Sequence, residues 1–504
     1  MYTFVAPLER AVATNPNGVA VVCQGREKTY EELALRVRKL VGALRKLGLQ
    51  PGDRVGMVGP NSDRYLELYF AVPSAGLVFV PVNWRLSDAE MTAVFADAGV
   101  RVLFRDGDFP TPESAEHVFD MPEDYEQFVE SGEEVALGDG IDEDDLAVLF
   151  YTSGTTGAGK GAMHTHRGLI SSGLHFAATW PFRQDTRWLI CSPMFHTGGT
   201  LAITATVYAG GTNVILPVFH PEQALDHIQS YRATHTLMVP TMLGAAVRAQ
   251  TENPRDVSSM KYLSHGASPI SIETLKATHA AFPDAQMLHV YGTTETTPIT
   301  TLLPHEERYL DTDLVRSCGQ PAIGVEVRVV DVSTEQPVAK GQSGELWVRS
   351  PSLMKGYWNK PEETAAVFTR EGWYRTGDLG YLDEHAHVFL VDRAKDMIVT
   401  GGENVYSMEV EAALSAHGSV GEVAVFGVPD ERWGEAVYAV VYALYPVTAE
   451  ELIAHCKERI AGYKVPKHVE IRTKDLPKSA AGKLLKRELR EPHWASQGSQ
   501  VAGS

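Results

Sequence analysis

The sequence lacks the features that mark several large classes of protein. Its 504 residues contain only four cysteines, which lie far apart, with no C-x-x-C pair and no histidine at zinc-ligand spacing beside them. We therefore expect neither a disulfide scaffold nor a structural zinc site, and a reducing, cytoplasmic compartment fits best. Lysine and arginine number 45 against 64 acidic residues, a formal net charge of −19. This balance argues against a nucleic-acid partner.

Long hydrophobic runs are also missing. The most apolar stretch, 71–82, is broken by Pro73, Gly76 and Pro81, and the N-terminus has no basic segment followed by an apolar one. We therefore expect neither an export signal nor a membrane span. The apolar share of 44% with 22% charged residues is typical of a globular protein. At about 150 residues per domain, the length predicts roughly three domain-sized units.

Helices and strands alternate through much of the chain. The capping box Thr29-x-x-Glu32 opens an apolar-periodic helix that ends at Gly48. The order helix, turn, strand recurs at 225–237 and at 272–290. This order predicts a mixed α/β body with largely parallel sheets.

Other segments depart from this rhythm. We interpret the acidic stretch 122–145 as a solvated connection into a buried strand at 146–151. Short alternating runs beyond residue 320 predict a small β-rich unit. After Asp392 the chain has the length of a separate module of about 100 residues. We predict that this module has a helix starting near Met408 and another capped by Thr448.

The most informative motif follows the predicted strand at 146–151. The run from Thr152 to Gly161 reads T-S-G-T-T-G-A-G-K-G. Glycines let backbone N–H groups crowd around an anion, while hydroxyls and a lysine add donors and charge, so the loop is typical of polyphosphate binding. The Walker A spacing also matches at Gly154, Gly159 and Lys160, but Gly161 stands where a serine or threonine must hold magnesium. A P-loop ATPase is therefore the weaker hypothesis.

The same run resembles the signature loop of the adenylate-forming (ANL) superfamily, S/T-S-G-S/T-T-G-x-P-K-G, with Gly159 at the proline position. Further blocks follow in the family's order over nearly the whole chain, which is similar in particular to acyl-CoA synthetases. The glycine is expected to loosen the loop without changing the reaction. The resemblance implies ATP binding by the loop residues Thr152, Ser153, Gly154, Thr155, Thr156, Gly157 and Lys160.

The run from Tyr291 to Glu295 resembles the family's Y-G-x-T-E block. By that resemblance Tyr291 stacks near the adenine, Thr294 contacts the α-phosphate, and Glu295 with Thr155 holds Mg²⁺. Carboxylate and hydroxyl oxygens suit a magnesium ion that bridges phosphates. The resemblance extends the nucleotide site to Gly266, Ala267, Gly292, Thr293, Asp378 and Arg393, the last two as ribose contacts.

His196, in the block Ser192 to His196, resembles the family's aromatic gate and is expected to border the reacting carboxylate. The implied acyl pocket comprises His196, Gly198, Gly199 and Thr293. Small residues there leave room for an acyl chain or an aromatic ring.

Lys483, in the run Ser479 to Lys483, resembles the family's catalytic lysine. Its ammonium could bridge the incoming carboxylate and the α-phosphate and offset their repulsion. Lys395 resembles the hinge about which the C-terminal domain turns between two half-reactions.

Gly401 and Gly402 resemble the loop that lines the pantetheine tunnel of acyl-CoA synthetases, and Lys464 is a candidate contact for CoA phosphates. Ser407 stands where the family has proline, and a serine could cap the coming helix.

The resemblance implies an α/β fold: a large N-terminal domain of mixed α/β subdomains plus a β-barrel-like subdomain, with a small mobile α+β C-terminal domain. We predict an adenylation domain at 1–392, a hinge at 393–396, a lid at 397–493 and a disordered tail at 494–504. The predicted function is an ATP- and Mg²⁺-dependent acid–CoA ligase acting through acyl-AMP on a medium- or long-chain fatty acid.

Several alternatives stay open at this point. An aryl or arylpropenoic acid could be the substrate, and a carrier protein could replace CoA as acceptor. An adenylating oxygenase resembling luciferase is a further reading. The sequence does not fix the oligomeric state, a homodimer being one option.

Overall fold

The computed structural model describes residues 2–152, 159–268, 270–306, 309–393, 396–400, 403–430, 432–478 and 484–494. The chain splits into two compact units. The first comprises Met1–Val327 with Val348–Tyr374, and the second comprises Arg328–Trp347 with Arg375–Ser504. The predicted hinge at 393–396 falls inside the second unit, and its position stays a prediction.

The first unit contains a sheet that is parallel except at one edge, where β7 and β8 form an antiparallel pair. Every residue of its strand β4 is buried, as expected for an interior parallel strand with both faces covered. The strands in order are β6 (His117–Asp120), β5 (Val100–Arg105), β3 (Arg54–Val58), β4 (Val78–Val82), β7 (Leu146–Thr152) and β8 (Lys160–Thr165).

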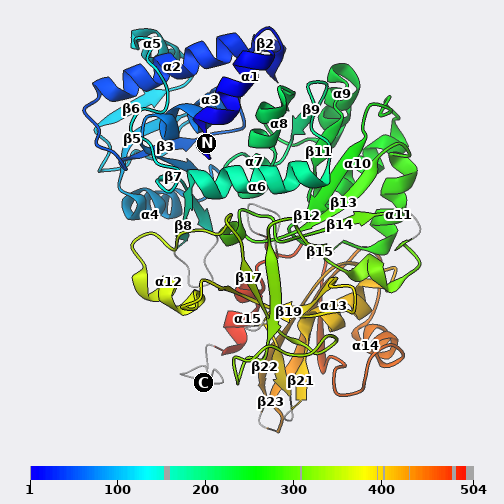
Figure 1. The fold of residues 1–504 in the computed structure, drawn as a ribbon. Coiled ribbons are helices and arrows are strands. Elements are labelled where there is room, and N and C mark those ends of the chain that lie inside the picture. Colours follow the sequence, from blue (N-terminus) through cyan, green and yellow to red (C-terminus); the bar gives the residue numbers. More distant parts are fainter. Residues whose placement is uncertain are drawn as a thin grey trace. The chain divides into compact units, whose positions relative to one another are not determined.

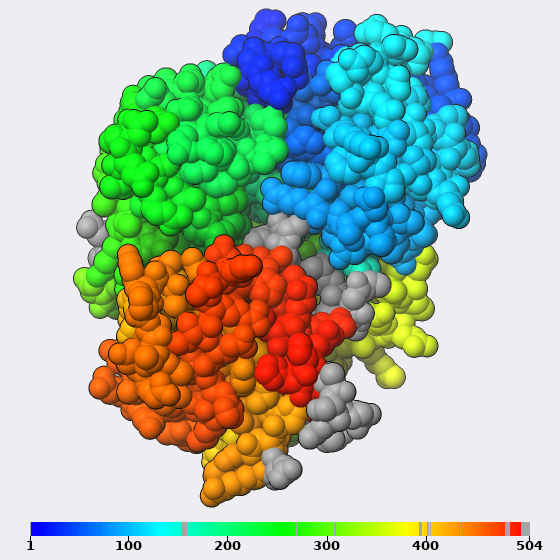
Figure 2. Space-filling view, turned by 180° about the vertical axis from the view of Figure 1, so that it is seen from behind, coloured from blue at the N-terminus to red at the C-terminus, as the bar shows by residue number. Residues whose placement is uncertain are grey.

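A larger sheet of the same unit joins segments from distant parts of the sequence, because β1 pairs in parallel with β10. The blue and cyan residues and the green residues of this unit accordingly lie side by side in Figure 2. The strands in order are β15 (Gln320–Pro321), β14 (Thr301–His305), β13 (Gln286–Tyr291), β12 (Tyr262–Gly266), β11 (His235–Leu237), β9 (Arg187–Ile190), β10 (Thr212–Ile215), β1 (Val19–Cys23) and β2 (Arg26–Thr29).

Helices of the first unit pack on these sheets and on one another; α6, for example, packs against α8 (Figure 1). The predicted capping box forms, since Thr29 and Glu32 exchange hydrogen bonds at the start of α2. The helices are α1 (Val5–Thr14), α2 (Tyr30–Lys46), α3 (Asp63–Ser74), α4 (Asp88–Ala98), α5 (Glu123–Ser131), α6 (His166–Thr179), α7 (Thr197–Thr200), α8 (Ile203–Ala209), α9 (Pro221–Tyr231), α10 (Pro240–Glu252), α11 (Ile272–Ala281) and α12 (Pro361–Val367), with 3-10 turns η1 (Thr294–Thr296) and η3 (Asp313–Arg316).

The second unit holds most of one antiparallel sheet and a separate α/β module. The sheet has the order β16 (Glu326–Val330), β17 (Gly344–Arg349), β18 (Tyr374–Leu382) and β19 (Val388–Arg393), and the unit boundary falls within its strands. The module's sheet runs β21 (Glu403–Val405), β20 (Ile398–Thr400), β23 (Gly434–Ala443) and β22 (Val420–Asp430), with β24 (His468–Arg472) parallel to β23. Its helices are α13 (Ser407–Ser415), α14 (Ala449–Lys457) and α15 (Lys486–Trp494).

Most predicted elements are confirmed, including the capped helix α14 and the helix–strand pairs α9–β11 and α11–β13. The prediction of a purely solvated connection at 122–145 is wrong. That segment contains α5, whose Tyr125, Phe128 and Val129 are buried. The acidic residues lie on the other face of this helix, so composition alone concealed its amphipathic spacing.

The prediction of an α/β fold with a large N-terminal and a small C-terminal part is confirmed. None of the four cysteines forms a disulfide; all are buried within the described ranges. Among the helices that the structure describes, none is both long enough and apolar enough to cross a membrane.

Candidate active site

The phosphate-loop motif joins the antiparallel pair β7–β8. Thr152 and Lys160 face each other at the open end of that pair, and the Thr152 hydroxyl donates to the Lys160 carbonyl at 3.4 Å. Ser153, Gly154, Thr155, Thr156 and Gly157 lie outside the described residues. The antiparallel pair therefore brings the two ends of the motif together.

The ammonium of Lys160 has two partners in the same unit. It forms an ion pair with the Glu363 carboxylate of α12 and lies 5.1 Å from the centroid of the Tyr357 ring. Segment 354–358 reaches this position because it pairs with β8: Trp358 donates its backbone N–H to Gly161, and Lys355 donates to Met163. The fold thus delivers two side chains to Lys160 that the sequence pattern did not indicate.

Tyr357 also contacts the predicted metal ligand. Its hydroxyl donates to Oε1 of Glu295 at 2.8 Å, and the backbone N–H of Met354 donates to the Glu295 carbonyl. Burial, assisted by the neighbouring Glu295 carboxylate, raises the pKa of Tyr357, so the phenol stays protonated and able to donate. Tyr357 therefore connects Lys160 and Glu295, which are 135 residues apart in the sequence.

The Tyr291 block turns sharply after β13 ends. A Cβ atom on Gly292 would lie 1.7 Å from the Pro298 carbonyl oxygen, so only glycine fits there. Thr294 and Glu295 lie in the 3-10 turn η1.

The Glu295 carboxylate, with Tyr357 beside it, fits a hard divalent cation. The Tyr357 hydroxyl occupies one oxygen of the Glu295 carboxylate, and carboxylate oxygen is a ligand that Mg²⁺ prefers. Within the described ranges no group of three or more His, Cys, Asp or Glu side chains could hold a metal. Mg²⁺ bound with a nucleotide typically uses one or two carboxylates and the phosphates, so a single carboxylate such as Glu295 is compatible with the protein's share of such a site.

The predicted adenine segment lies beside the Tyr291 block. Gly266 at the end of β12 is the register partner of Val290 on the parallel strand β13. Ala267 then adopts a left-handed backbone with φ +67°, which is uncommon for a residue with a side chain. The carboxyl ends of neighbouring parallel strands are where α/β folds bind ligands.

The predicted gate block is tied to α3. The hydroxyl of Tyr69 donates to the Met194 carbonyl at 2.6 Å, and half-buried His196 precedes α7. A Cβ atom on Gly199 would lie 2.0 Å from the Pro193 carbonyl oxygen, whereas one on Gly198 would touch only Leu237 at 4.0 Å. Gly199 therefore shapes the turn, while Gly198 leaves space.

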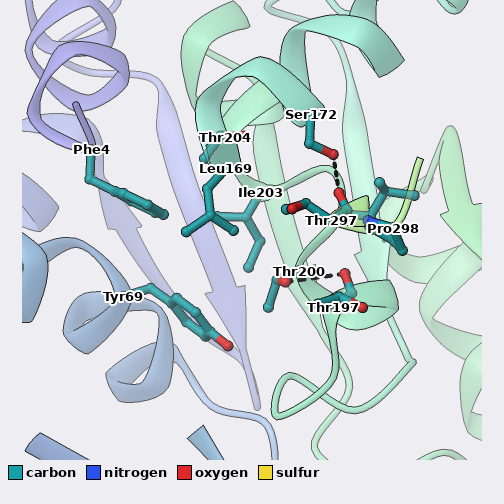
Figure 3. A pocket seen from close by; sticks show the side chains of 11 residues that line it. Phe4, Tyr69, Leu169, Ser172, Thr197, Thr200, Ile203, Thr204, Thr297 and Pro298 are labelled. Atoms are coloured by element: carbon teal, nitrogen blue, oxygen red, sulfur yellow. Dashed lines mark hydrogen bonds between the residues drawn. The ribbon is translucent and has the colours of Figure 1, made fainter. Parts of the chain in front are cut away.

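A cavity opens beside α7, between Tyr69 of α3 and Thr297 (Figure 3). Its empty space of about 370 Å³ includes open solvent. It is not lined by the predicted acyl-pocket residues His196, Gly198, Gly199 and Thr293. Its wall combines aromatic and aliphatic side chains with hydroxyls: Phe4, Tyr69, Leu169, Ser172, Thr197, Thr200, Leu201, Ile203, Thr204, Thr297 and Pro298.

Thr297, in the wall of this cavity, has a left-handed backbone with φ +60°. Ser172 donates to its carbonyl, and its own hydroxyl contacts Nδ1 of buried His164 at 2.9 Å. Burial lowers the pKa of His164 to about 3, which keeps the imidazole neutral. Strained residues of this kind persist where surrounding contacts hold them and are frequent at functional sites.

The two predicted ribose contacts meet in the second unit. Asp378 on β18 and Arg393 on β19 are register partners across the antiparallel pair, although 15 positions separate them. Asp378 is 5% exposed, and its backbone N–H donates to the Thr376 hydroxyl oxygen at 3.0 Å.

Other predicted residues of the second unit lie in or near gaps. Lys464 holds both carboxylate oxygens of Glu409 at 2.7 Å, so a phosphate would have to compete with that acid. Lys395, Gly401, Gly402 and Lys483 lie outside the described residues, and their roles stay predictions.

Ser407 does not cap α13, contrary to expectation. The N-cap residue is Tyr406 without a side-chain cap, and Ser407 is the first residue of the helix. Its backbone N–H and its hydroxyl both donate to the Asp392 carboxylate instead.

Comparisons with known proteins agree with the geometry. The family model described as "AMP-binding enzyme" matches residues 8–358, and that described as "AMP-binding enzyme C-terminal domain" matches residues 409–483. A feruloyl-CoA synthase of Amycolatopsis sp is 38% identical over 96% of this chain and 97% of its own. The fatty acid–[acyl-carrier-protein] ligase ScoC of Streptomyces coeruleorubidus is 35% identical over 96% and 95%.

A solved structure shares the whole fold. The o-succinylbenzoate CoA synthetase MenE of Bacillus subtilis, in complex with its acyl-adenylate intermediate, matches with a TM-score of 0.86 and 29% identity, covering 96% of this chain and 97% of its own. The family resemblance seen in the sequence is confirmed: the chain belongs to the AMP-binding enzyme family, among the adenylate-forming acid–thiol ligases.

Proposed function

We propose that the protein joins a compact aryl acid, of the arylpropenoic type, to coenzyme A in two steps. The acid first reacts with ATP to give acyl-AMP and pyrophosphate, and the thiol of CoA then displaces AMP. The lining of the cavity beside α7 is the single observation that carries the choice of acid, because aromatic side chains there face side chains with hydroxyls.

The cavity wall favours a ring over a long chain. Phe4 and Tyr69 enter from α1 and α3, opposite the threonines of α7 and α8 (Figure 3). Flat aromatic walls complement a planar ring, and hydroxyls such as those of Thr200 and Thr204 can meet ring substituents. The 38% identity to the feruloyl-CoA synthase supports this class.

A medium- or long-chain fatty acid is the second candidate. The mostly apolar wall tolerates an acyl chain, and the fatty acid ligase ScoC is 35% identical. The same relative makes a carrier-protein thiol the alternative acceptor. Helices α6, α7 and α8 supply most of the side chains in the cavity wall. We expect them to leave less room for a long chain than for a compact acid.

The chain's own residues have defined parts in the first step. Lys160 supplies positive charge to the phosphates, and Tyr357 holds the Glu295 carboxylate in place beside it. Mg²⁺, when bound by Glu295, would neutralise phosphate charge. Asp378 would accept hydrogen bonds from ribose hydroxyls. Lys483 would offset the repulsion between the carboxylate and the α-phosphate.

Lys483 and the Gly401–Gly402 loop serve different steps of this scheme. We propose that the module carrying both turns about Lys395 between the steps. Lys483→Ala should then abolish acyl-AMP formation while thioester formation from supplied acyl-AMP largely persists. Equal loss of both activities would contradict this division.

A pyrophosphate-release panel tests the substrate assignment. The purified protein, ATP and Mg²⁺ are combined with a hydroxycinnamic acid, benzoate, octanoate or palmitate, with and without CoA. We expect the highest kcat/KM for the arylpropenoic acid, and thioester only when CoA is present. A preference for palmitate would overturn the assignment of the acid, and thioester formation only on a carrier protein would overturn that of the acceptor.

A further inference from the structure

Four polar side chains of the second unit form a buried or partly buried chain of contacts that the scheme above does not use. Asp392, the penultimate residue of β19, is 2% exposed, and Ser407, the first residue of α13, is fully buried. The backbone N–H and the hydroxyl of Ser407 both donate to the Asp392 carboxylate, the hydroxyl at 3.0 Å from Oδ1. The carboxylate is therefore held by two donors from one residue.

The contacts continue to the last helix. Nζ of Lys486 donates to the Ser407 hydroxyl oxygen at 2.8 Å and pairs with the Glu411 carboxylate at 2.7 Å. Glu411 also accepts from the backbone N–H of Val425 at 2.8 Å. One network thus links β19, α13, α15 and β22.

The network places one cation among several acids. Burial opposes charge on Lys486, but the Glu411, Asp396 and Asp392 carboxylates together raise its pKa above the ordinary value. The ammonium therefore stays charged, in a partly buried place beside acids that outnumber it. Such networks are stable when every member is satisfied and are damaged when one partner is removed.

The network's place in the sequence connects it to both half-reactions. Asp392 immediately precedes Arg393 and the predicted hinge, whereas Ser407, Glu411 and Lys486 follow the hinge. Lys486 is three positions after Lys483. The contact between Asp392 and Ser407 therefore joins the strand before the hinge to the module that carries the catalytic lysine.

The residues on either side of 479–483 are firmly held on the same module. Lys478 pairs with Leu484 in a β-bridge and forms an ion pair with Glu422, and Leu485 donates to the Pro477 carbonyl at 2.9 Å. Lys486, close by in the sequence, is anchored as well.

Ser407 is a departure from the family pattern, which has proline at this position. Proline has no backbone N–H and no hydroxyl, so it could make neither contact to Asp392. We propose that Ser407 is a positioning residue: it fastens Asp392 to the lysine-bearing module and thereby sets how the enzyme divides its time between adenylation and thioester formation. This inference rests on the two-step function proposed above.

The two halves of the contact belong to opposite sides of the hinge. A turn of the module about Lys395 would carry Ser407 away from Asp392, so the contact stabilises one pose and is absent from the other. Removing it shifts the balance between the poses and changes the two half-reactions unequally.

A graded pair of variants tests this role. Ser407→Ala removes the hydroxyl and keeps the N–H, whereas Ser407→Pro removes both donors and is compatible with the first position of a helix. Ser415→Ala, at the exposed end of the same helix, is the matched control. Acyl-AMP formation without CoA and thioester formation from supplied acyl-AMP are measured separately, together with thermal unfolding.

We expect Ser407→Ala to change the ratio of the two rates by about 2- to 12-fold, the range that one net hydrogen bond of 0.5–1.5 kcal/mol corresponds to. Ser407→Pro should change the ratio further in the same direction, and Ser415→Ala should leave it unchanged. A purely structural role would lower both rates by one factor, along with the melting temperature, and that result would overturn the proposal.

Amide hydrogen exchange without substrates separates this proposal from the proposed function. Peptides covering 403–415 and 484–494 should exchange faster in Ser407→Pro than in the wild type. If the wild type makes no acyl-AMP with any acid, the proposed function fails. Unchanged exchange in Ser407→Pro would overturn the fastening role, whatever the outcome for the proposed function. Faster exchange with an unchanged rate ratio would likewise overturn the positioning role.

Discussion

The hydroxyl of Tyr357 donates to the carboxylate of Glu295 at 2.8 Å, and the same ring lies beneath the ammonium of Lys160. One buried phenol thus touches both the predicted metal ligand and the predicted phosphate ligand. The two contacts use different parts of the side chain: the oxygen serves Glu295, and the ring face serves Lys160. They can therefore be separated by mutation.

Tyr357→Phe tests the contact to Glu295, because it keeps the ring and removes only the hydroxyl. The freed carboxylate should be less well oriented for Mg²⁺, so we expect half-maximal pyrophosphate release to need about 2- to 12-fold more Mg²⁺, the factor that a typical net hydrogen bond corresponds to. Titration of the initial rate with Mg²⁺ measures this. Tyr445→Phe, at a tyrosine that is 66% exposed, is the control. An unchanged Mg²⁺ requirement would show that the hydroxyl does not position Glu295.

Glu363→Gln tests the ion pair that holds Lys160. Because Glu363 competes with phosphate for the ammonium, its neutralisation should lower KM for ATP by about 2- to 5-fold, a modest effect because both side chains are partly exposed to solvent. Initial rates at varied ATP measure KM. Glu371→Gln, at an exposed acid of the same unit, is the control. A higher KM would mean that Glu363 holds Lys160 in its working position instead.

Thr200→Phe tests the cavity as the acid's binding site. The added ring fills space beside Ile203 and Tyr69, so kcat/KM for an arylpropenoic acid should fall at least about tenfold, while acetate should be affected much less. Thr251→Phe, at an exposed position of α10, is the control. Equal losses for both acids would indicate general damage and would remove the support for the proposed substrate class.

A cluster of buried histidines at the edge of the larger sheet makes stability depend on pH. His265 stacks on His289 with ring centroids 5.0 Å apart, and its Nε2 lies 3.2 Å from Nδ1 of His305. His279 on α11 adds a further repulsive charge if protonated. Burial lowers the pKa of His289 to about 4 and that of His305 to about 3, and that of His265 falls well below its ordinary value.

Because these folded-state pKa values lie below the unfolded value of about 6.5, the stability of the neutral cluster is fully present above that pH. It is lost as the pH falls from about 6.5 towards 4. At pH 5 each such histidine costs about 2 kcal/mol, since one pKa unit is 1.36 kcal/mol. His289→Phe should therefore lose about 2 kcal/mol less free energy of unfolding between pH 7 and pH 5 than the wild type. Urea unfolding at both pH values measures the difference, and a loss equal to that of the wild type and of the control His385→Asn would contradict it.

Local signals in the sequence predicted much of the fold. The capping boxes at Thr29 and Thr448 give helix starts because the pattern involves only four neighbouring residues. The same kind of reasoning missed α5, where buried Tyr125, Phe128 and Val129 repeat at helical spacing inside an acidic stretch. Attention to periodicity in place of charge would have found that helix.

The candidate site was only partly predictable. The blocks around Lys160 and Glu295 stand out because each concentrates glycines, hydroxyls or an acid in one short run. Tyr357 carries no local signal of this kind; its role depends on a contact to Glu295 across 62 positions. At Ser407 a local signal was present but misleading. A serine at the start of a helix suggests a cap, whereas Ser407 contacts Asp392 of strand β19.

The pairing of β18 with β19 contains an irregularity with a chemical consequence. Gly380 pairs with Leu390, but Leu379 pairs with Asp392, so Val391 is bulged out of the ladder. In an unbroken ladder Asp378 would stand opposite Asp392, and two like charges would meet. The single extra residue advances the strand by one step and sets Asp378 against Arg393 instead. If the bulge flattened while Val391 stayed in the chain, Leu379 would pair with Val391 and the two acids would stand opposite each other, so the bulge itself keeps like charges apart in this unit.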